Sequence, residues 1–188
     1  MVGVENHIKM KKISWVVSIL IIIVTLVSIS NNRESDSDFL DSQLKEIEGY
    51  FDQRAIKNET VSQAAIAWHL DHMLKTINRV SENLLRSDPN AYVSKFNMQR
   101  IVVHTSGIIP RGAAQSPPSV RPPDVVLLDS LTMQLKKARQ NLKDISGLDE
   151  NAFFAHPVFD HLDRDQSRRF LEIHTNHHLK IVQDILRE

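Results

Sequence analysis

The sequence predicts an all-α protein, a four-helix bundle preceded by an N-terminal transmembrane helix. Three observations lead to this fold class. Residues 13–29, ISWVVSILIIIVTLVSI, contain no charged side chain, and an uncharged apolar run of about 17 to 25 residues crosses a bilayer as a helix. After residue 37, apolar residues recur every three or four positions, which is the helical period. No stretch alternates with period two for long enough to predict a strand.

The first thirty residues form the predicted membrane segment. Lys9, Lys11 and Lys12 precede the apolar run, and NNRESDSD follows it. Because positive charge marks the cytoplasmic flank, we expect a single-pass anchor with the domain on the extracytoplasmic side, periplasmic or extracellular. A cleaved signal peptide is the alternative, since Ser28 and Ser30 are small residues at the positions that a signal peptidase reads. The predicted organisation is an anchor or signal segment over 1–30, a linker over 31–37 and a helical domain over 38–188.

Two amphipathic helices are predicted after the linker. The first covers about residues 38–56, and the second begins near Thr60 or Ser62, either of which can cap a helix. The second helix ends near Ser87, because Pro89 cannot continue it. The apolar stripes consist of Leu40, Leu44, Ile47 and Phe51 in the first helix and of Ile66, Leu70, Met73, Ile77, Val80 and Leu84 in the second.

The middle of the chain is less regular. A helix is predicted over residues 92–103, and the proline-rich crossover GIIPRGAAQSPPSVRPP follows it. A third amphipathic helix is then capped by Asp124 or Asp129 and ended by Gly147. The last helix begins near Asp163 or Asp165 and runs to the C-terminus. Four long helices with one long crossover predict an antiparallel four-helix bundle.

The composition limits the chemistry that this domain can perform. Lys plus Arg and Asp plus Glu each number 23, so no excess of positive charge favours nucleic acid as a partner. Cysteine is absent, which excludes disulfides, thiolate metal ligands and a cysteine nucleophile. The nine histidines are therefore the residues to examine.

Three histidines lie within five residues of the last helix, in FLEIHTNHHLK. His174 and His178 share a 3-4-3-4 spacing with apolar neighbours and are predicted to face the core, whereas His177 lies about 100° round the helix, at the rim. Imidazoles at i and i+4 stand one turn apart and can bind one ion. The alternative is a pair of hydrogen-bonded core histidines without a metal.

A metal site of this kind needs a third ligand from a neighbouring helix. The second helix offers His69 and His72 in AIAWHLDHML. Helical phase favours His69, because it lies nearer the apolar stripe, while His72 lies on its flank. Buried imidazoles need polar partners, and a shared metal satisfies several of them at once.

Two motifs resemble a known family. AWHLDHML on the second helix, together with HPVFDHLDRDQSRRFLEIHTNHHLKIV at the end, is similar to the DinB-like superfamily of bacterial four-helix-bundle metalloproteins. The closest branch is a group of uncharacterised domains with a terminal HPxFxxLxxxQxxRFxxxHxxHHL motif. The resemblance covers about residues 36–187. It implies an up-up-down-down bundle that holds a divalent metal with one histidine of the second helix and the terminal HxxxH pair, His174 and His178. Its WxxxHL-like frame places His72, four residues after Trp68, as the third ligand, with His69 as the competitor.

The resemblance also implies a range of functions. Relatives include metal-dependent hydrolases and thiol-dependent transferases, so the chain is expected to bind a metal and to act on a small-molecule substrate. Zinc is the expected metal for three imidazoles, with nickel, iron and manganese as alternatives. Its affinity is expected to weaken below about pH 6, because imidazole must be neutral to bind a metal. His156, just before the last helix, is a candidate acid or base, and a loop-capping role is its alternative.

A non-catalytic function is the alternative to an enzymatic one. The domain can be a membrane-anchored helical binding module with a structural metal or with none. Its expected partners are the membrane and a small molecule but no nucleic acid, and a homodimer is compatible with the sequence. An open metal position favours an enzyme, whereas a fourth protein ligand favours a structural role.

Overall fold

The computed structural model describes residues 15, 18, 38–112 and 115–187. The chain divides into two compact units, Met1–Glu34 and Ser35–Glu188. The predicted anchor over 13–29 lies outside the described residues, except for Trp15 and Ser18. Among the residues that are described, no helix combines the length and the apolar character needed to cross a bilayer.

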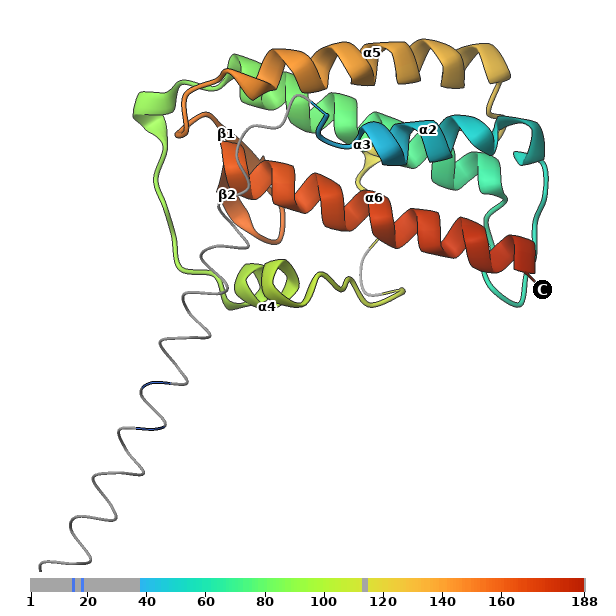
Figure 1. Ribbon diagram of the computed structural model, residues 1–188, viewed down its shortest axis with the longest axis horizontal. Helices are drawn as coiled ribbons and strands as arrows, with labels where there is room; N and C mark the ends of the chain where they lie inside the picture. Colours follow the sequence, from blue (N-terminus) through green and yellow to red (C-terminus); the bar gives the residue numbers. More distant parts are fainter. Residues whose placement is uncertain (1–14, 16–17, 19–37, 113–114, 188) are drawn as a thin grey trace, which may run out of the picture. The chain divides into compact units, whose positions relative to one another are not determined.

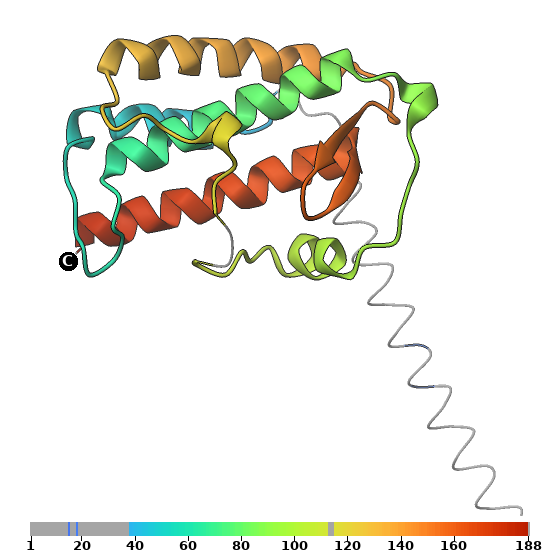
Figure 2. The same cartoon turned by 180° about the vertical axis from the view of Figure 1, so that it is seen from behind.

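The second unit is mostly helical, which confirms the predicted all-α character. Its helices are α2 (Asp41–Gly49), α3 (Ile66–Arg86), α4 (Met98–Ser106), α5 (Leu128–Ser146) and α6 (Arg164–Arg187). Single 3-10 turns occur at Phe51–Gln53, Pro89–Ala91 and Pro118–Val120. One antiparallel hairpin pairs β1 (Phe153–His156) with β2 (Asp160–Asp163). In Figure 1 and Figure 2, α4 lies on the opposite side of α6 from α5.

The helices α2, α3, α5 and α6 share one apolar core. The predicted stripes are inside it: Leu44 and Ile47 of α2 and Leu70 and Ile77 of α3 are completely buried. The contact between α3 and α5 also contains a polar pair, because Asn141 donates a 2.9 Å hydrogen bond to Asn78 from side chain to side chain. A buried amide pair of this kind satisfies both partners and fixes the register of the two helices.

The helix directions differ from the up-up-down-down order. Side-chain hydrogen bonds join Gln43 to Asn176 and Gln183 to Glu46, so α2 and α6 are parallel. The helices α3 and α5 are parallel to each other and run opposite to α2 and α6 (Figure 1). The order is therefore up-down-down-up. An up-up-down-down bundle needs two long crossovers, whereas this chain has one, over residues 87–127.

Helix starts were predicted less well than helix faces. The first helix is shorter than 38–56, because Leu40 has a left-handed φ of 63° before it and the chain tightens into a 3-10 turn after Gly49. The second begins at Ile66 and not at Thr60 or Ser62, and its N-cap, Ala65, has no side chain that can cap it. Neither Asp124 nor Asp129 caps α5, although Gly147 is its C-cap as predicted.

The segment between α3 and α6 contains two further differences. The helix predicted over 92–103 begins instead at Met98, because the Asn97 side chain accepts a hydrogen bond from the Arg100 amide and caps it there. The hairpin was not predicted, since its strands have only four residues each and are half buried. Asp163 ends the hairpin and accepts a 2.8 Å hydrogen bond from the Gln166 amide, as predicted for the cap of the last helix.

Candidate metal centre

Three imidazole rings meet between α3 and α6. His72 belongs to α3, and His174 and His178 belong to α6. One ring nitrogen of each lies within 4.8 Å of the other two, and His72 Nε2 is 3.1 Å from His174 Nε2. In a tetrahedral zinc site with Zn–N bonds of about 2.0–2.1 Å, the ligand nitrogens are roughly 3.3–3.4 Å apart. The three histidines therefore lie close enough to bind a metal ion.

The two helices bring these rings together by their spacing and direction. His174 and His178 are one turn apart, with ring centroids separated by 4.7 Å. Because α3 runs antiparallel to α6, His72 reaches both of them, at centroid distances of 5.0 Å and 4.8 Å. His72 and His178 are buried, and His174 keeps part of its surface exposed. The predicted inward direction of the HxxxH pair is thus observed in the fold.

His72 is held by the crossover between α4 and α5. Its Nδ1 donates a 2.9 Å hydrogen bond to the carbonyl of Val120 and lies 3.2 Å from Ser116 Oγ. A carbonyl only accepts, so the proton of neutral His72 is on Nδ1 and the lone pair on Nε2 points toward His174. Trp68 stacks on the ring at a centroid distance of 4.9 Å and fixes its plane.

His69 lies behind His178 and not among the three converging nitrogens. Its Nδ1 is 3.0 Å from His178 Nδ1, and its Nε2 is 3.0 Å from Ser62 Oγ. Both candidate histidines of α3 are therefore buried, but they meet different partners. His72 lies close to both rings of the pair from α6, whereas His69 contacts the Nδ1 atom of His178.

The remaining histidines of α6 differ in their partners. His174 Nδ1 is buried and has no hydrogen-bond partner among the described residues. His177 bonds to the backbone of Ile109 in the crossover. The prediction that His177 belongs to the rim agrees with this contact, because its ring is turned toward the crossover.

Burial keeps the imidazoles of the cluster neutral. It lowers the pKa of His69 to about 4 and lowers the pKa values of His72, His174 and His178. Repulsion between neighbouring imidazolium charges lowers the pKa values of His174 and His178 further. Neutral imidazole is the form that binds metals, so the rings have the protonation state that ligation requires.

His156 lies near the cluster but does not touch it. Its Nδ1 accepts hydrogen bonds from the amides of Val158 and Phe159, each at 3.1 Å, so its proton is on Nε2. The Phe170 ring contacts both His156 and His174, at centroid distances of 4.7 Å and 5.4 Å. Burial lowers the pKa of His156 to about 4. The loop-capping contact predicted as its alternative is present.

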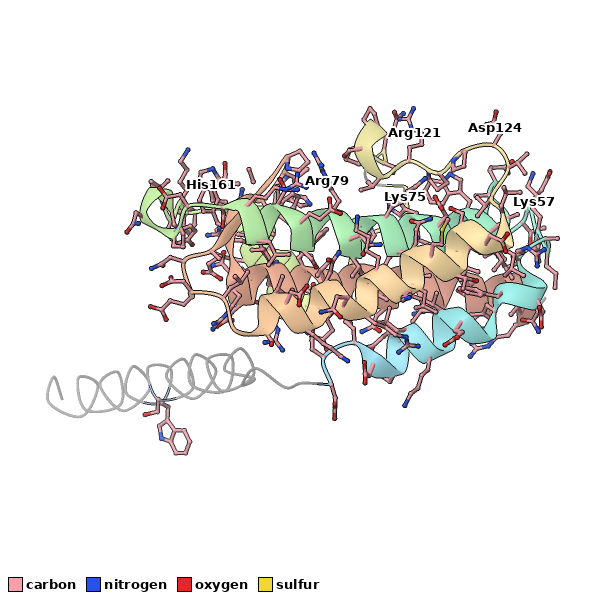
Figure 3. The ribbon with its side chains drawn as sticks, turned by 90° about the horizontal axis from the view of Figure 1, so that it is seen from above. Lys57, Lys75, Arg79, Arg121, Asp124 and His161 are labelled. Carbon is pink, nitrogen blue, oxygen red and sulfur yellow. The ribbon has the colours of Figure 1, made fainter. Side chains whose placement is uncertain are left out.

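The crossover extends across α3 and α6 beside these rings. Lys75 of α3 donates a 3.3 Å hydrogen bond to the carbonyl of Arg121, and Figure 3 shows Arg121 next to α3. At its other end Arg111 forms an ion pair with Asp184 of α6. The Asp71 carboxylate does not orient His72, because it is bonded to the Gln134 amide and ion-paired with Lys75.

The sequence did not predict the groups that form hydrogen bonds with the histidine rings of α3. Ser62, Ser116 and the Val120 carbonyl all bond to histidines of α3. Backbone carbonyls and single serines in loops carry no periodic signal, so only the folded chain reveals them. The length of the proline-rich crossover was the available indication, since long loops in compact domains are commonly functional.

Comparisons of the chain with models of protein families, with curated proteins and with solved structures gave no match.

Proposed function

We propose that this protein binds one divalent metal ion, zinc in the first place, through His72, His174 and His178. The observation that carries the proposal is the convergence of three neutral imidazoles from two helices onto one point. The arrangement of α2, α3, α5 and α6 around one core supports a four-helix bundle, with an up-down-down-up order in place of the one that the DinB-like resemblance implies. His72 is preferred to His69 as third ligand because its Nε2 faces His174 directly.

The three-histidine site favours a metal-dependent hydrolase or thiol-dependent transferase acting on a small molecule. Three protein ligands leave one position of a tetrahedral ion open, and a metal bound in this way lowers the pKa of a water or thiol and polarises a carbonyl. The protein's own contribution is to bring one nitrogen of each of three buried rings to one point and to direct the Nε2 of His72 toward His174 through the hydrogen bond at its Nδ1. His156 presents an Nε2–H beyond Phe170 and is proposed as a donor toward the substrate and not as a base.

The second candidate is a non-catalytic module with a structural metal. The crossover favours it, because Val120 and Ser116 lie directly against His72 and cover one side of the cluster. The number of protein ligands separates the two functions: X-ray absorption of the zinc-loaded chain should show three histidine nitrogens and one exchangeable oxygen for an enzyme. Four histidine nitrogens would favour the structural role.

The membrane location remains part of the proposal. The uncharged segment over 13–29 and the lysines before it support an N-terminal anchor with the helical domain on the extracytoplasmic side. A reporter fused to the C-terminus and active only outside the cytoplasm is the expected result. Reporter activity in the cytoplasm would reverse the orientation.

The metal proposal is tested by the metal content of the purified chain. The wild-type protein should bind about one zinc per chain. The double substitution His174→Ala with His178→Ala should abolish binding, because one imidazole cannot hold the ion. His177→Ala is the matched control, since it removes a neighbouring ring on the same helix that points to the crossover. Full zinc occupancy in the double variant would overturn the proposal.

A further inference from the structure

A line of three side chains leads from the protein surface to the metal centre. Ser62 is half buried before α3, and His69 and His178 are buried behind it. Ser62 Oγ is 3.0 Å from His69 Nε2, and His69 Nδ1 is 3.0 Å from His178 Nδ1. We call these residues the Ser62–His69–His178 line. It ends at Nδ1 of His178, so Nε2 is the nitrogen of that ring that remains for a metal.

The short contact between the two Nδ1 atoms requires exactly one proton. Two unprotonated nitrogens would repel each other, and two N–H groups would clash, so one ring donates and the other accepts. A neutral imidazole carries one proton in total, on one of its two nitrogens. Fixing the proton in this contact therefore fixes the tautomer of both histidines.

Two arrangements satisfy this requirement. In the first, Ser62 donates to His69 Nε2 and His69 Nδ1–H donates to His178, which leaves the proton of His178 on Nε2. In the second, His178 Nδ1–H donates to His69, and His69 Nε2–H donates to Ser62 Oγ. Ser62 Oγ can accept this bond as well as the one from the Ala64 amide, because a hydroxyl oxygen has two lone pairs. Only the second arrangement leaves Nε2 of His178 free to bind a metal.

We propose that His69 is a positioning residue: it accepts the Nδ1–H of His178, passes its own Nε2–H to Ser62, and so presents the Nε2 lone pair of His178 to the ion. This inference rests on the proposed metal binding and adds a role for residues outside the ligand set. The Val120 carbonyl performs the same task for His72, where it accepts the Nδ1–H. Metal-binding histidines characteristically donate their second N–H to such a partner, which sets the ring orientation.

The choice of a histidine as the partner has a specific consequence. A carbonyl can only accept, so it enforces one tautomer, whereas His69 can donate or accept. Which of the two hydrogen-bond arrangements the Ser62–His69–His178 line adopts is therefore determined by what binds at Nε2 of His178. His69→Phe keeps an aromatic ring in the same place and removes both nitrogens, which leaves the Nδ1–H of His178 without its acceptor.

The first test reads the tautomers directly. In the full chain loaded with Zn²⁺ alone, long-range proton–nitrogen NMR correlations should show the proton of His178 on Nδ1 and that of His69 on Nε2. Nitrogen shifts distinguish protonated from unprotonated imidazole nitrogens, and they do not depend on any activity of the protein. A proton on Nδ1 of His69 in the zinc-loaded protein would overturn the proposal.

The second test measures zinc affinity by calorimetry. His69→Phe should weaken binding by about 10–100-fold, the usual effect of losing such a hydrogen-bond partner. His177→Phe is the matched control and should bind zinc as the wild type does, because His177 contacts the crossover. Wild-type affinity in His69→Phe would reject the role of His69 while leaving the metal site intact. Absence of zinc binding by the wild-type chain would instead remove the proposed function. If circular dichroism shows that His69→Phe is unfolded, the NMR measurement on the wild-type chain decides alone.

Discussion

Burial also acts on histidines outside the proposed ligand set. His104 belongs to α4 and His156 is the last residue of β1, and burial lowers the pKa of each to about 4. The nearby guanidinium groups of Arg169 and Arg100 lower the pKa of His104 further. An unfolded chain restores the ordinary imidazole pKa of about 6.5, so protonation favours the unfolded state of this protein.

We therefore predict that the metal-free protein loses stability in mild acid. The stabilising difference is fully present above pH 6.5 and is lost as the pH falls from 6.5 toward 4, because the unfolded chain then binds more protons than the folded one. Urea unfolding midpoints measured across this range should decrease. His156→Asn keeps an acceptor for the amides of Val158 and Phe159 but does not titrate, so its decrease should be smaller. A midpoint that rises between pH 6.5 and 4 would contradict the prediction.

At this scale the apolar spacing predicted the inward pair, whereas the third ring, His72, was predicted from the family resemblance and against helical phase. The 3-4 spacing of apolar residues was sufficient to direct His174 and His178 inward. His69 and His72 are three positions apart on a helix that contacts both α5 and α6, so both lie on a wide buried arc. The helical phase of a residue relative to one apolar stripe cannot decide which of these two histidines is the third ligand. Their distances to the histidines of α6 can.

Among the elements, α4 has an inverted distribution of polar and apolar residues. Arg100 is buried, with its guanidinium donating to the carbonyls of Lys95, Phe159 and His161. Ile101 and Val102 on the other face are 44% and 56% exposed. The helix is therefore attached to the rest of the domain by hydrogen bonds from Arg100 and by those that Arg169 of α6 donates to the carbonyl of His104, together with the partly buried Val103.

This inversion predicts an unusual order of mutational effects. Arg100→Ala should lower the free energy of unfolding by about 2–3 kcal/mol, because it leaves three carbonyls without their charged donor. Ile101→Ala should change it by less than about 0.5 kcal/mol, as expected of an exposed residue. Urea denaturation of both variants measures the difference. A larger loss for Ile101→Ala would show that the outer face of α4 is covered in solution.

Element boundaries were the weakest part of the prediction from sequence. Ser62 was a reasonable candidate for the cap of the second helix by residue type, yet its hydroxyl bonds to His69 and α3 begins at Ile66. The hairpin was not predicted, because strands of four residues are too short to show a two-residue alternation of apolar and polar side chains. Of the two starts predicted for the last helix, Asp163 and Asp165, the structure has Asp163 as the cap, where its side chain accepts the hydrogen bond of the Gln166 amide.

For the whole domain, loop lengths predicted the topology better than the family resemblance did. One long crossover, between α3 and α5, makes those two helices parallel and leaves their other neighbours antiparallel. The core stripes of all four helices were visible in the apolar spacing. The path of the crossover over His72 could not be predicted from the sequence, because it depends on hydrogen bonds from loop residues such as Ser116.

Zinc should stabilise the domain as a whole, because its ligands belong to two helices that must both be folded. Binding to the folded state alone adds about 2.7 kcal/mol of stability when free zinc is 100-fold above its dissociation constant. The thermal unfolding midpoint should therefore rise with zinc concentration in the wild type. The His174→Ala, His178→Ala double variant should show no such rise. An equal rise in both proteins would mean that zinc binds elsewhere.

His72 and His174 are 102 positions apart in the chain, although their nitrogens are 3.1 Å apart in the fold. Closing a flexible loop of that length costs roughly 4 kcal/mol in chain entropy by the (3/2)RT ln n relation, and the packing of α3 against α6 must supply it before the third ligand arrives. A fragment containing α6 alone keeps the HxxxH pair but lacks that ligand. Metal occupancy of this centre would therefore report the fraction of chains that have completed their long-range contacts, so a metal-sensitive dye could follow the last stage of folding in real time.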